Sequence, residues 1–101
     1  MAIVAISVTP IGTGSPSVGE YVAEAVRVIE RSGLRYEVNA MHTVVEGDLD
    51  EILRLVPEMH RACFDRGAVR VSTVMKLDDR RDRPSSIAAK VRSVREKMDH
   101  S

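Results

Sequence analysis

The chain is expected to adopt an α+β fold, a ferredoxin-like β-α-β-β-α-β sandwich with an extra C-terminal helix. Two observations predict it. Apolar residues alternate over four segments and recur at helical spacing over three others. The two middle strands are separated by too few residues for anything but a hairpin. Right-handed crossovers on either side of that hairpin place the helices on one face of a four-stranded antiparallel sheet.

Composition indicates one domain spanning residues 1–101, because a chain of this length supports a single core. The apolar fraction is 44%, yet only three residues are aromatic, Tyr21, Tyr36 and Phe64. The core is therefore expected to be aliphatic.

Charge and targeting signals exclude several classes of partner. Fifteen basic and fifteen acidic side chains cancel, so no global field attracts nucleic acid or an anionic membrane. The sheet of RNA-recognition modules also needs stacking aromatic residues, and here it offers only Tyr36. No apolar run approaches the roughly 20 residues of a membrane span, and the N-terminus lacks the features of a signal peptide. With Cys63 as the sole cysteine, we expect a cytoplasmic protein in a reducing compartment.

The first strand is predicted over Ala2–Thr9, and because both of its faces are small or apolar, it should be covered on both sides. Ser17 and Glu20 have the spacing of a capping box, which predicts the start of a helix. Gly33 is suited to end it in a left-handed conformation. The helix carries one apolar stripe, formed by Val18, Val22, Ala25, Val26 and Ile29.

Strands are predicted next over Leu34–Asn39 and Met41–Glu46. Asp48 and Glu51 offer a second capping pair at the start of an amphipathic helix. Pro57 lies inside that helix and should kink it or mark a boundary.

The last third of the chain carries a strand, a charged connection and a helix. Alternation after Gly67 predicts a strand with Val69 and Leu77 at the two ends of one face. Asp78–Pro84 reads as the charged connection, and Ser85 as the cap of the final helix. The apolar stripe of that helix comprises Ile87, Val91, Val94 and Met98.

The face of the sheet opposite the helices is expected to be apolar, with the final helix covering part of it. Such a patch usually marks an interface. We therefore expect a homo-oligomer, a dimer or tetramer, in which sheets pack face to face or edge strands pair. The residues expected on this face are Ile3, Ala5, Val44 or Val45, and Val74.

The loop TPIGTGSPSVGE, Thr9–Glu20, is the first candidate site. Gly12 and Gly14 before a helix present free N–H groups that suit an anion. The loop lacks the Gly-Lys-Ser/Thr ending of a P-loop and the third glycine of a dinucleotide fingerprint. A turn followed by a capped helix explains it without a ligand, apart from the hydroxyls of Thr9, Thr13 and Ser15.

Two candidate metal sites are disfavoured by the sequence. Asp78, Asp79 and Asp82 could join Glu46 and Asp48 around Mg²⁺, but a self-neutralising solvated loop or inter-subunit salt bridges explain these charges better.

His60 and Cys63, with His42, have too few partners for zinc. Cys63 lies on a core stripe, so a buried structural thiol is favoured. A Cys-His nucleophilic pair is the alternative, which burial of the thiol disfavours.

Three blocks, PIGTGSPSVGEYV, MHTVVEGDLDE and VMKLDDRRDRP, resemble the signatures of the thiamine-binding protein family, short YkoF-like proteins. The resemblance runs from Val8 to Val94. It implies a ferredoxin-like subunit, assembly into dimers and tetramers through the sheets, and binding of thiamine or its hydroxymethylpyrimidine moiety. It implies no established catalytic activity and no required cofactor.

The resemblance also implies a set of ligand-binding residues. Glu46 could accept from the aminopyrimidine or balance the thiazolium cation, so Glu46→Gln is expected to weaken binding and leave the fold intact. The family usually has glycine where this chain has His42, whose side chain could narrow the pocket or add a wall. With Thr9 from the opening loop and His42 added, the full set of candidate ligand-binding residues is Thr9, Pro10, Gly12, Thr13, Ser15, Ser17, His42, Thr43, Glu46, Asp78 and Arg80.

The leading functional hypothesis is a non-catalytic carrier, buffer or sensor of thiamine or hydroxymethylpyrimidine. One alternative is a protein-interaction or oligomerisation module that uses the open face of the sheet. Another is an enzyme of thiamine metabolism with Glu46 or Asp78 as general acid or base.

Overall fold

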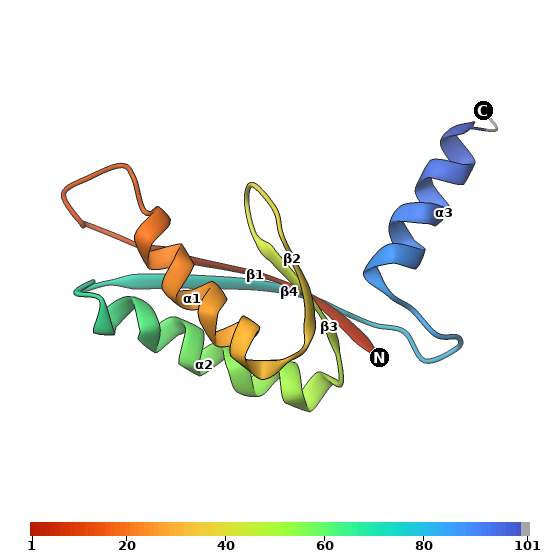
Figure 1. Cartoon of the computed structure of the whole chain (residues 1–101), viewed down its shortest axis with the longest axis horizontal. Coiled ribbons are helices and arrows are strands. Elements are labelled where there is room, and N and C mark those ends of the chain that lie inside the picture. The colour runs from red at the N-terminus through yellow and green to blue at the C-terminus, as the bar shows by residue number, and fades with distance from the viewer. Residues whose placement is uncertain (100–101) are drawn as a thin grey trace.

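The computed structural model describes residues 1–99 and confirms the ferredoxin-like fold. Its four-stranded antiparallel sheet has the order β2-β3-β1-β4. Figure 1 shows two helices lying along the sheet and the third at the far end of the molecule. The strands are β1 (Ala2–Pro10), β2 (Arg35–Val38), β3 (Thr43–Gly47) and β4 (Val71–Asp79), and the helices are α1 (Gly19–Ser32), α2 (Leu49–Asp65) and α3 (Ile87–Asp99).

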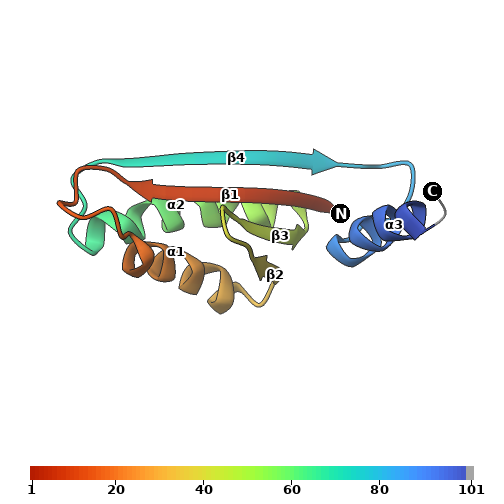
Figure 2. The same cartoon turned by 90° about the horizontal axis from the view of Figure 1, so that it is seen from above.

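The core lies between one face of the sheet, here called the inner face, and helices α1 and α2, which lie next to each other in Figures 1 and 2. Alternation along β1 directs Val4, Ile6 and Val8 to the inner face. Fully buried side chains from the helices complete a core that is aliphatic, as predicted. They are Ile29 of α1 with Ile52, Met59 and Cys63 of α2.

The predicted capping box at the start of α1 is wrong. The residue before the helix is Val18, and no side chain caps it. Because α1 begins at Gly19, Ser17 lies one position too early to serve as the cap. The N–H of Ser17 instead donates to Ser15 Oγ. The predicted end of α1 is confirmed, since Gly33 is left-handed with φ 78°.

The start of α2 is confirmed, because Asp48 Oδ2 accepts a hydrogen bond from the N–H of Glu51 at 3.2 Å. The helix continues through Pro57 without a break, so that proline marks no boundary. The start predicted for α3 is wrong by one residue. Ser86, and not Ser85, accepts from the N–H of Ala89 at 3.0 Å.

Each of the four strands differs from the prediction in at least one boundary. β4 begins at Val71 and continues to Asp79, so Asp78 and Asp79 belong to the strand and not to the charged connection. β2 and β3 are shorter than predicted, and His42 lies in the turn between them. A backbone hydrogen bond of 2.9 Å from Asn39 N–H to the carbonyl of His42 closes this turn and confirms the hairpin.

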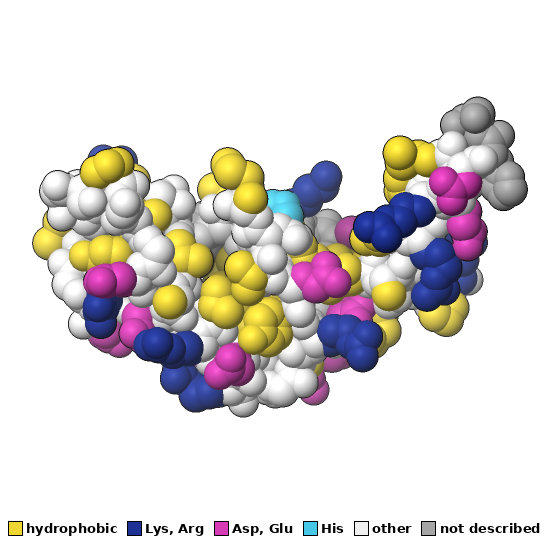
Figure 3. Space-filling model, turned by 45° about the horizontal axis from the view of Figure 1, so that its top comes forward, with side chains coloured by type: hydrophobic (Ala, Val, Ile, Leu, Met, Phe, Trp, Pro, Cys, Tyr) yellow, Lys and Arg dark blue, Asp and Glu magenta, His cyan; other side chains and the backbone are white. Residues whose placement is uncertain are grey.

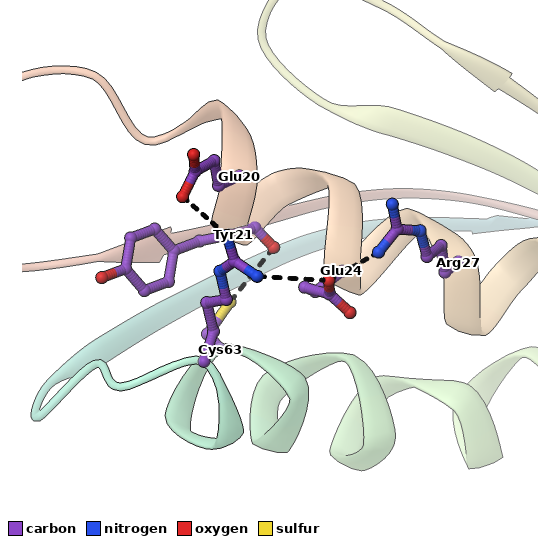
Figure 4. Close-up of polar contacts among 6 residues, drawn as sticks. Glu20, Tyr21, Glu24, Arg27 and Cys63 are labelled. Carbon is purple, nitrogen blue, oxygen red and sulfur yellow. Dashed lines mark hydrogen bonds and ion pairs between the residues drawn. The ribbon is translucent and has the colours of Figure 1, made fainter.

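A polar cluster joins α1 to the end of α2 (Figure 4). Arg66 pairs with Glu20 at 2.8 Å and with Glu24 at 4.0 Å. Beside it the Cys63 thiol donates to the carbonyl of Tyr21 at 3.7 Å. The thiol is buried, as predicted, and burial raises its pKa. These contacts fix the N-terminal half of α1 against α2.

Helix α3 docks on the opposite face of the sheet, here called the outer face, through its first turn alone. Glu46 Oε2 accepts from the N–H of Ile87 at 2.8 Å, and Lys90 pairs with Asp78 at 2.5 Å. The contact buries Ile3 and Ile87. The rest of α3 extends beyond the sheet (Figures 1 and 2), so the predicted cover of the outer face is confined to one end. Among residues 1–99, no helix is long and apolar enough to cross a membrane.

Candidate functional site

A difference in strand length creates a cavity on the inner face. β3 pairs with β1 only as far as the register Ile6 to Thr43, whereas β1 continues to Pro10. From Ser7 onward β1 pairs with β4 alone. The edge of β1 that a longer β3 would cover is therefore open, and its backbone N–H and C=O groups have no strand partner on that side.

The cavity at this open edge has a volume of about 280 Å³ and is closed by three further elements. The N-terminal half of α1 forms one wall, the β2-β3 hairpin tip another, and Met59 of α2 closes the end. Apolar side chains dominate the lining, among them Val8, Val22 and Val26. The polar residues around it are Ser7, Thr9, Asn39, His42 and Thr43, of which Ser7 and Thr9 belong to the open edge of β1.

The lining of the cavity is uncharged, because none of the described residues that form it is Asp, Glu, Lys or Arg. Such a lining would bury a fixed charge at high cost. It suits a flat, neutral heteroaromatic ring, whose polar atoms can meet hydroxyls and the open backbone edge of β1.

Three of the predicted site residues line this cavity, Thr9, His42 and Thr43. Thr43 is buried on the inner face, opposite Ile6, while Thr9 lies near the end of β1. They come from two segments more than thirty positions apart, which the hairpin brings together.

The loop after β1 uses its hydroxyls within itself. Thr13 Oγ1 donates to the carbonyl of Ser15 at 3.0 Å, and Ser15 Oγ accepts from Ser17 at 3.1 Å. Gly12 and Gly14 have φ values of 76° and 82°, which turn the chain in a way that L side chains resist. The three hydroxyl residues line a second hollow beside Glu20, apart from the cavity. Pro10 is buried in the sheet opposite Val71.

Glu46 lies on the outer face, away from the cavity. Its side chain is 8% exposed, accepts from Ile87 N–H and lies 3.5 Å from the guanidinium of Arg35. Asp78 is its neighbour on the same face, and hydrogen bonding to Lys90 lowers the pKa of Asp78. Both carboxylates therefore contact the first turn of α3.

Arg80 follows β4 and forms a bidentate contact with Asp82. Its Nε donates to Oδ1 at 2.5 Å and its Nη2 to Oδ2 at 2.8 Å. This hydrogen bonding lowers the pKa of Asp82 to about 2. Within residues 1–99, no three His, Cys, Asp or Glu side chains gather closely enough to hold a metal ion. His60 contacts Thr73 instead, with 2.6 Å between Nδ1 and Oγ1.

Sequence reasoning missed most of the cavity lining. Val22 and Val26 read as core positions of a helix, and Ser7 and Asn39 belong to no motif. One signal was present. The first predicted strand is longer than either hairpin strand, so part of its edge must lack a partner on the hairpin side.

Fold and cavity together define a ferredoxin-like domain with a neutral hollow of ligand size between hairpin and helix. The chain belongs to the thiamine-binding protein family, whose sequence model matches residues 4–95. A UPF0045 protein of Methanothermobacter thermautotrophicus is 43% identical over 94 residues, covering 92% of this chain and 95% of the relative.

Two solved structures are similar along nearly their whole length. A protein from Methanocaldococcus jannaschii has a TM-score of 0.87 and 37% identity, and the match covers 94% of this chain and 96% of that one. A protein from Thermotoga maritima, whose name refers it to thiamine biosynthesis or salvage, has a TM-score of 0.77 and 29% identity. That match covers 92% of this chain and 97% of the other. Both similarities agree with the ferredoxin-like assignment.

Proposed function

We propose that this chain is a non-catalytic binding protein for thiamine or its hydroxymethylpyrimidine moiety, and that the pyrimidine ring occupies the inner-face cavity. The observation that carries the proposal is a neutral cavity beside the open edge of β1, in a member of the thiamine-binding protein family. The name of the Thermotoga maritima structure points to the same chemistry.

The volume and charge of the cavity determine which part of thiamine enters it. The volume of about 280 Å³ is slightly below the roughly 300–1,000 Å³ of small-molecule sites. An aminopyrimidine is neutral and flat, while the thiazolium of thiamine carries a fixed positive charge. With no carboxylate in the lining, the cation is more stable at the mouth, in contact with water.

The proposed contacts follow from the lining. The hydroxyl of Thr43 donates to a ring nitrogen or accepts from the amino group. The open backbone edge near Ser7 supplies the complementary N–H and C=O groups. The imidazole of His42 forms part of the wall at the hairpin turn.

Glu46 and Asp78 are assigned in this proposal to the docking of α3. The same contacts argue against the enzymatic alternative. A general acid needs a pKa near the working pH, whereas Lys90 lowers the pKa of Asp78. Glu46 is occupied by the N–H of Ile87 and lies near Arg35. A carrier, buffer or sensor in the cytoplasm needs neither residue as a catalyst.

Self-association is the second part of the proposal. β4 is an edge strand of nine residues, and its side chains remain exposed on both faces, with Val74 64%, Met75 47% and Leu77 41% exposed. A long apolar edge of this kind favours pairing with another strand. A dimer or tetramer that joins subunits through their sheets would cover it, and light scattering would measure its mass.

Thermal unfolding with added ligand tests the binding proposal. Hydroxymethylpyrimidine at about 100 times its dissociation constant adds ~2.7 kcal/mol to the folded state, which raises the midpoint by roughly 10 °C or more. Val22→Phe places a ring in the cavity wall and should abolish the shift. Ala23→Phe adds the same ring on the exposed side of α1 and should retain it.

Two results would contradict the proposal. One is the absence of a shift with hydroxymethylpyrimidine, thiamine and thiamine phosphates alike. The other is an equal shift in the Val22→Phe variant, which would place the ligand elsewhere.

A further inference from the structure

A basic groove lies between α3 and the connection that precedes it, far from the cavity. Its volume is about 640 Å³. Figure 3 shows Lys and Arg side chains gathered at this α3 end of the molecule. The charged side chains of its lining are five basic residues and one acidic residue, namely Arg80, Arg83, Lys90, Arg92, Lys97 and Glu96.

Positive charge in this groove exceeds what its neighbours neutralise. Two of the basic residues are held by acids outside the lining, Arg80 by Asp82 and Lys90 by Asp78. Among residues 1–99, the other three basic residues form no ion pair, although Arg83 is near enough to Asp82 to help lower its pKa. Since the chain as a whole carries no net charge, the groove is a local concentration of positive potential.

Hydroxyl groups accompany the unpaired cations. Lys97 Nζ donates to Ser93 Oγ at 2.8 Å, so both side chains lie on the same side of α3. Ser85 is half-buried in the connection that forms the opposite wall. Guanidinium, ammonium and hydroxyl donors around one hollow match the oxygens of a phosphoryl group.

We propose that this groove binds the phosphoryl group of a small phosphorylated molecule. Its volume falls within the range of small-molecule sites. A nucleic acid fits less well. None of the described residues that line the groove is aromatic, so base stacking has no platform there, and Asp78, Asp82 and Glu96 interrupt any basic track along it.

The docking of α3 builds this site. The contacts of Ile87 with Glu46 and of Lys90 with Asp78 hold the first turn of the helix to the sheet, so that the connection and α3 face each other across the hollow. The inference does not depend on a ligand in the inner-face cavity.

The inference is tested by titrating the full chain with inorganic pyrophosphate and following the NMR chemical shifts of the backbone amides. The largest shifts are expected between residues 80 and 97. The double variant Arg83→Gln/Arg92→Gln should weaken binding by about tenfold or more, since a hydrogen bond to a charged group contributes ~1.5–3 kcal/mol. Arg95→Gln makes the same charge change on the same helix outside the groove and should alter affinity less than about twofold.

The inference is overturned if the amide shifts fall elsewhere, if Arg95→Gln weakens binding as much as the double variant, or if millimolar pyrophosphate produces no shifts. Tighter binding of a single-stranded RNA, with shifts that extend beyond the groove, would also overturn it. The Val22→Phe variant keeps the groove and should bind pyrophosphate normally. Its result therefore separates failure of this site from failure of the cavity.

Discussion

Glu46 Oε2 accepts a hydrogen bond from the backbone N–H of Ile87 at 2.8 Å, across 41 positions of sequence. A strand carboxylate thereby satisfies one of the N–H groups that the first turn of α3 leaves unpaired. Its negative charge also lies at the end of the helix where the dipole favours it. This contact, together with the pair between Lys90 and Asp78, is what joins α3 to the sheet.

Glu46→Ala should detach the first turn of α3. Loss of the acceptor leaves the N–H of Ile87 without its partner, which costs roughly 1–3 kcal/mol of unfolding free energy. Urea denaturation measures the loss, and hydrogen exchange at Ile87 should accelerate. Glu37→Ala changes an exposed acid on β2 and serves as the control.

A second substitution of Glu46 tests whether this carboxylate docks α3 or binds the ligand. In our account Glu46→Gln leaves the affinity for hydroxymethylpyrimidine unchanged, because the cavity lies on the inner face. An affinity about tenfold weaker in that variant would show that Glu46 contacts the ligand.

Thr43→Val replaces a hydroxyl in the cavity with a methyl group of similar size. If the hydroxyl bonds the pyrimidine, affinity should fall about threefold to tenfold, the usual worth of one neutral hydrogen bond. Thr13→Val is the matched control in the loop after β1 and should bind normally. Isothermal titration calorimetry measures the affinity of both variants for hydroxymethylpyrimidine. Equal affinities would show that the Thr43 hydroxyl does not contact the ligand.

The contact between Glu20 and Arg66 predicts a pH dependence of stability. The hydrogen bond from Arg66 and its charge lower the pKa of Glu20 below its ordinary value of 4.5. Because the folded state binds the proton less readily than the unfolded chain, this stabilisation is present above about pH 4.5 and is lost as the pH falls through the lowered pKa.

Thermal midpoints of the wild type and Glu20→Gln, measured from about pH 6 to pH 2, check this prediction. The difference between them should shrink below about pH 4.5 and also shrink at high salt, because both side chains are exposed. A difference that stays constant over the whole range would contradict the assignment.

Cys63 should be inert in the folded protein. Its side chain is fully buried and its thiol pKa is raised, so the reactive thiolate is scarce and inaccessible. Ellman's reagent should therefore label it only at the rate at which the chain opens, and rapidly in urea. Fast labelling without denaturant would show that the α1-α2 interface is open in solution.

Local patterns were sufficient to predict the fold. The alternation of Val4, Ile6 and Val8 and the helical spacing of Ala25 and Ile29 are short-range signals of buried faces, and the structure buries these residues in its core. Asp48 also caps its helix as predicted, because an N-cap needs only residues three positions apart.

Predictions failed where a partner lies far along the chain. Ser17 and Glu20 have capping spacing, but Arg66, 46 positions from Glu20, takes that carboxylate. Asp78 was assigned to a loop from its charge, yet pairing with Ile3 of β1 keeps it in β4.

The candidate site was only partly visible for the same reason. Thr43 was identified through the family resemblance, His42 as a departure from it, and Thr9 as a loop hydroxyl that a turn alone does not explain. The neighbours that enclose them depend on where β3 stops and how the hairpin tip turns over α1. Those features follow from strand pairing across the whole sheet, which no local motif records.

The central claim is that the pyrimidine binds in the inner-face cavity. Its most direct test is to titrate the chain with hydroxymethylpyrimidine and to follow the NMR chemical shifts of the backbone amides. Our account predicts that the largest shifts occur at residues 7–9 and 39–43, the two segments that bring Thr9 and Thr43 to the cavity. Shifts centred on Glu46 and the first turn of α3, or no shifts at saturating ligand, would contradict it.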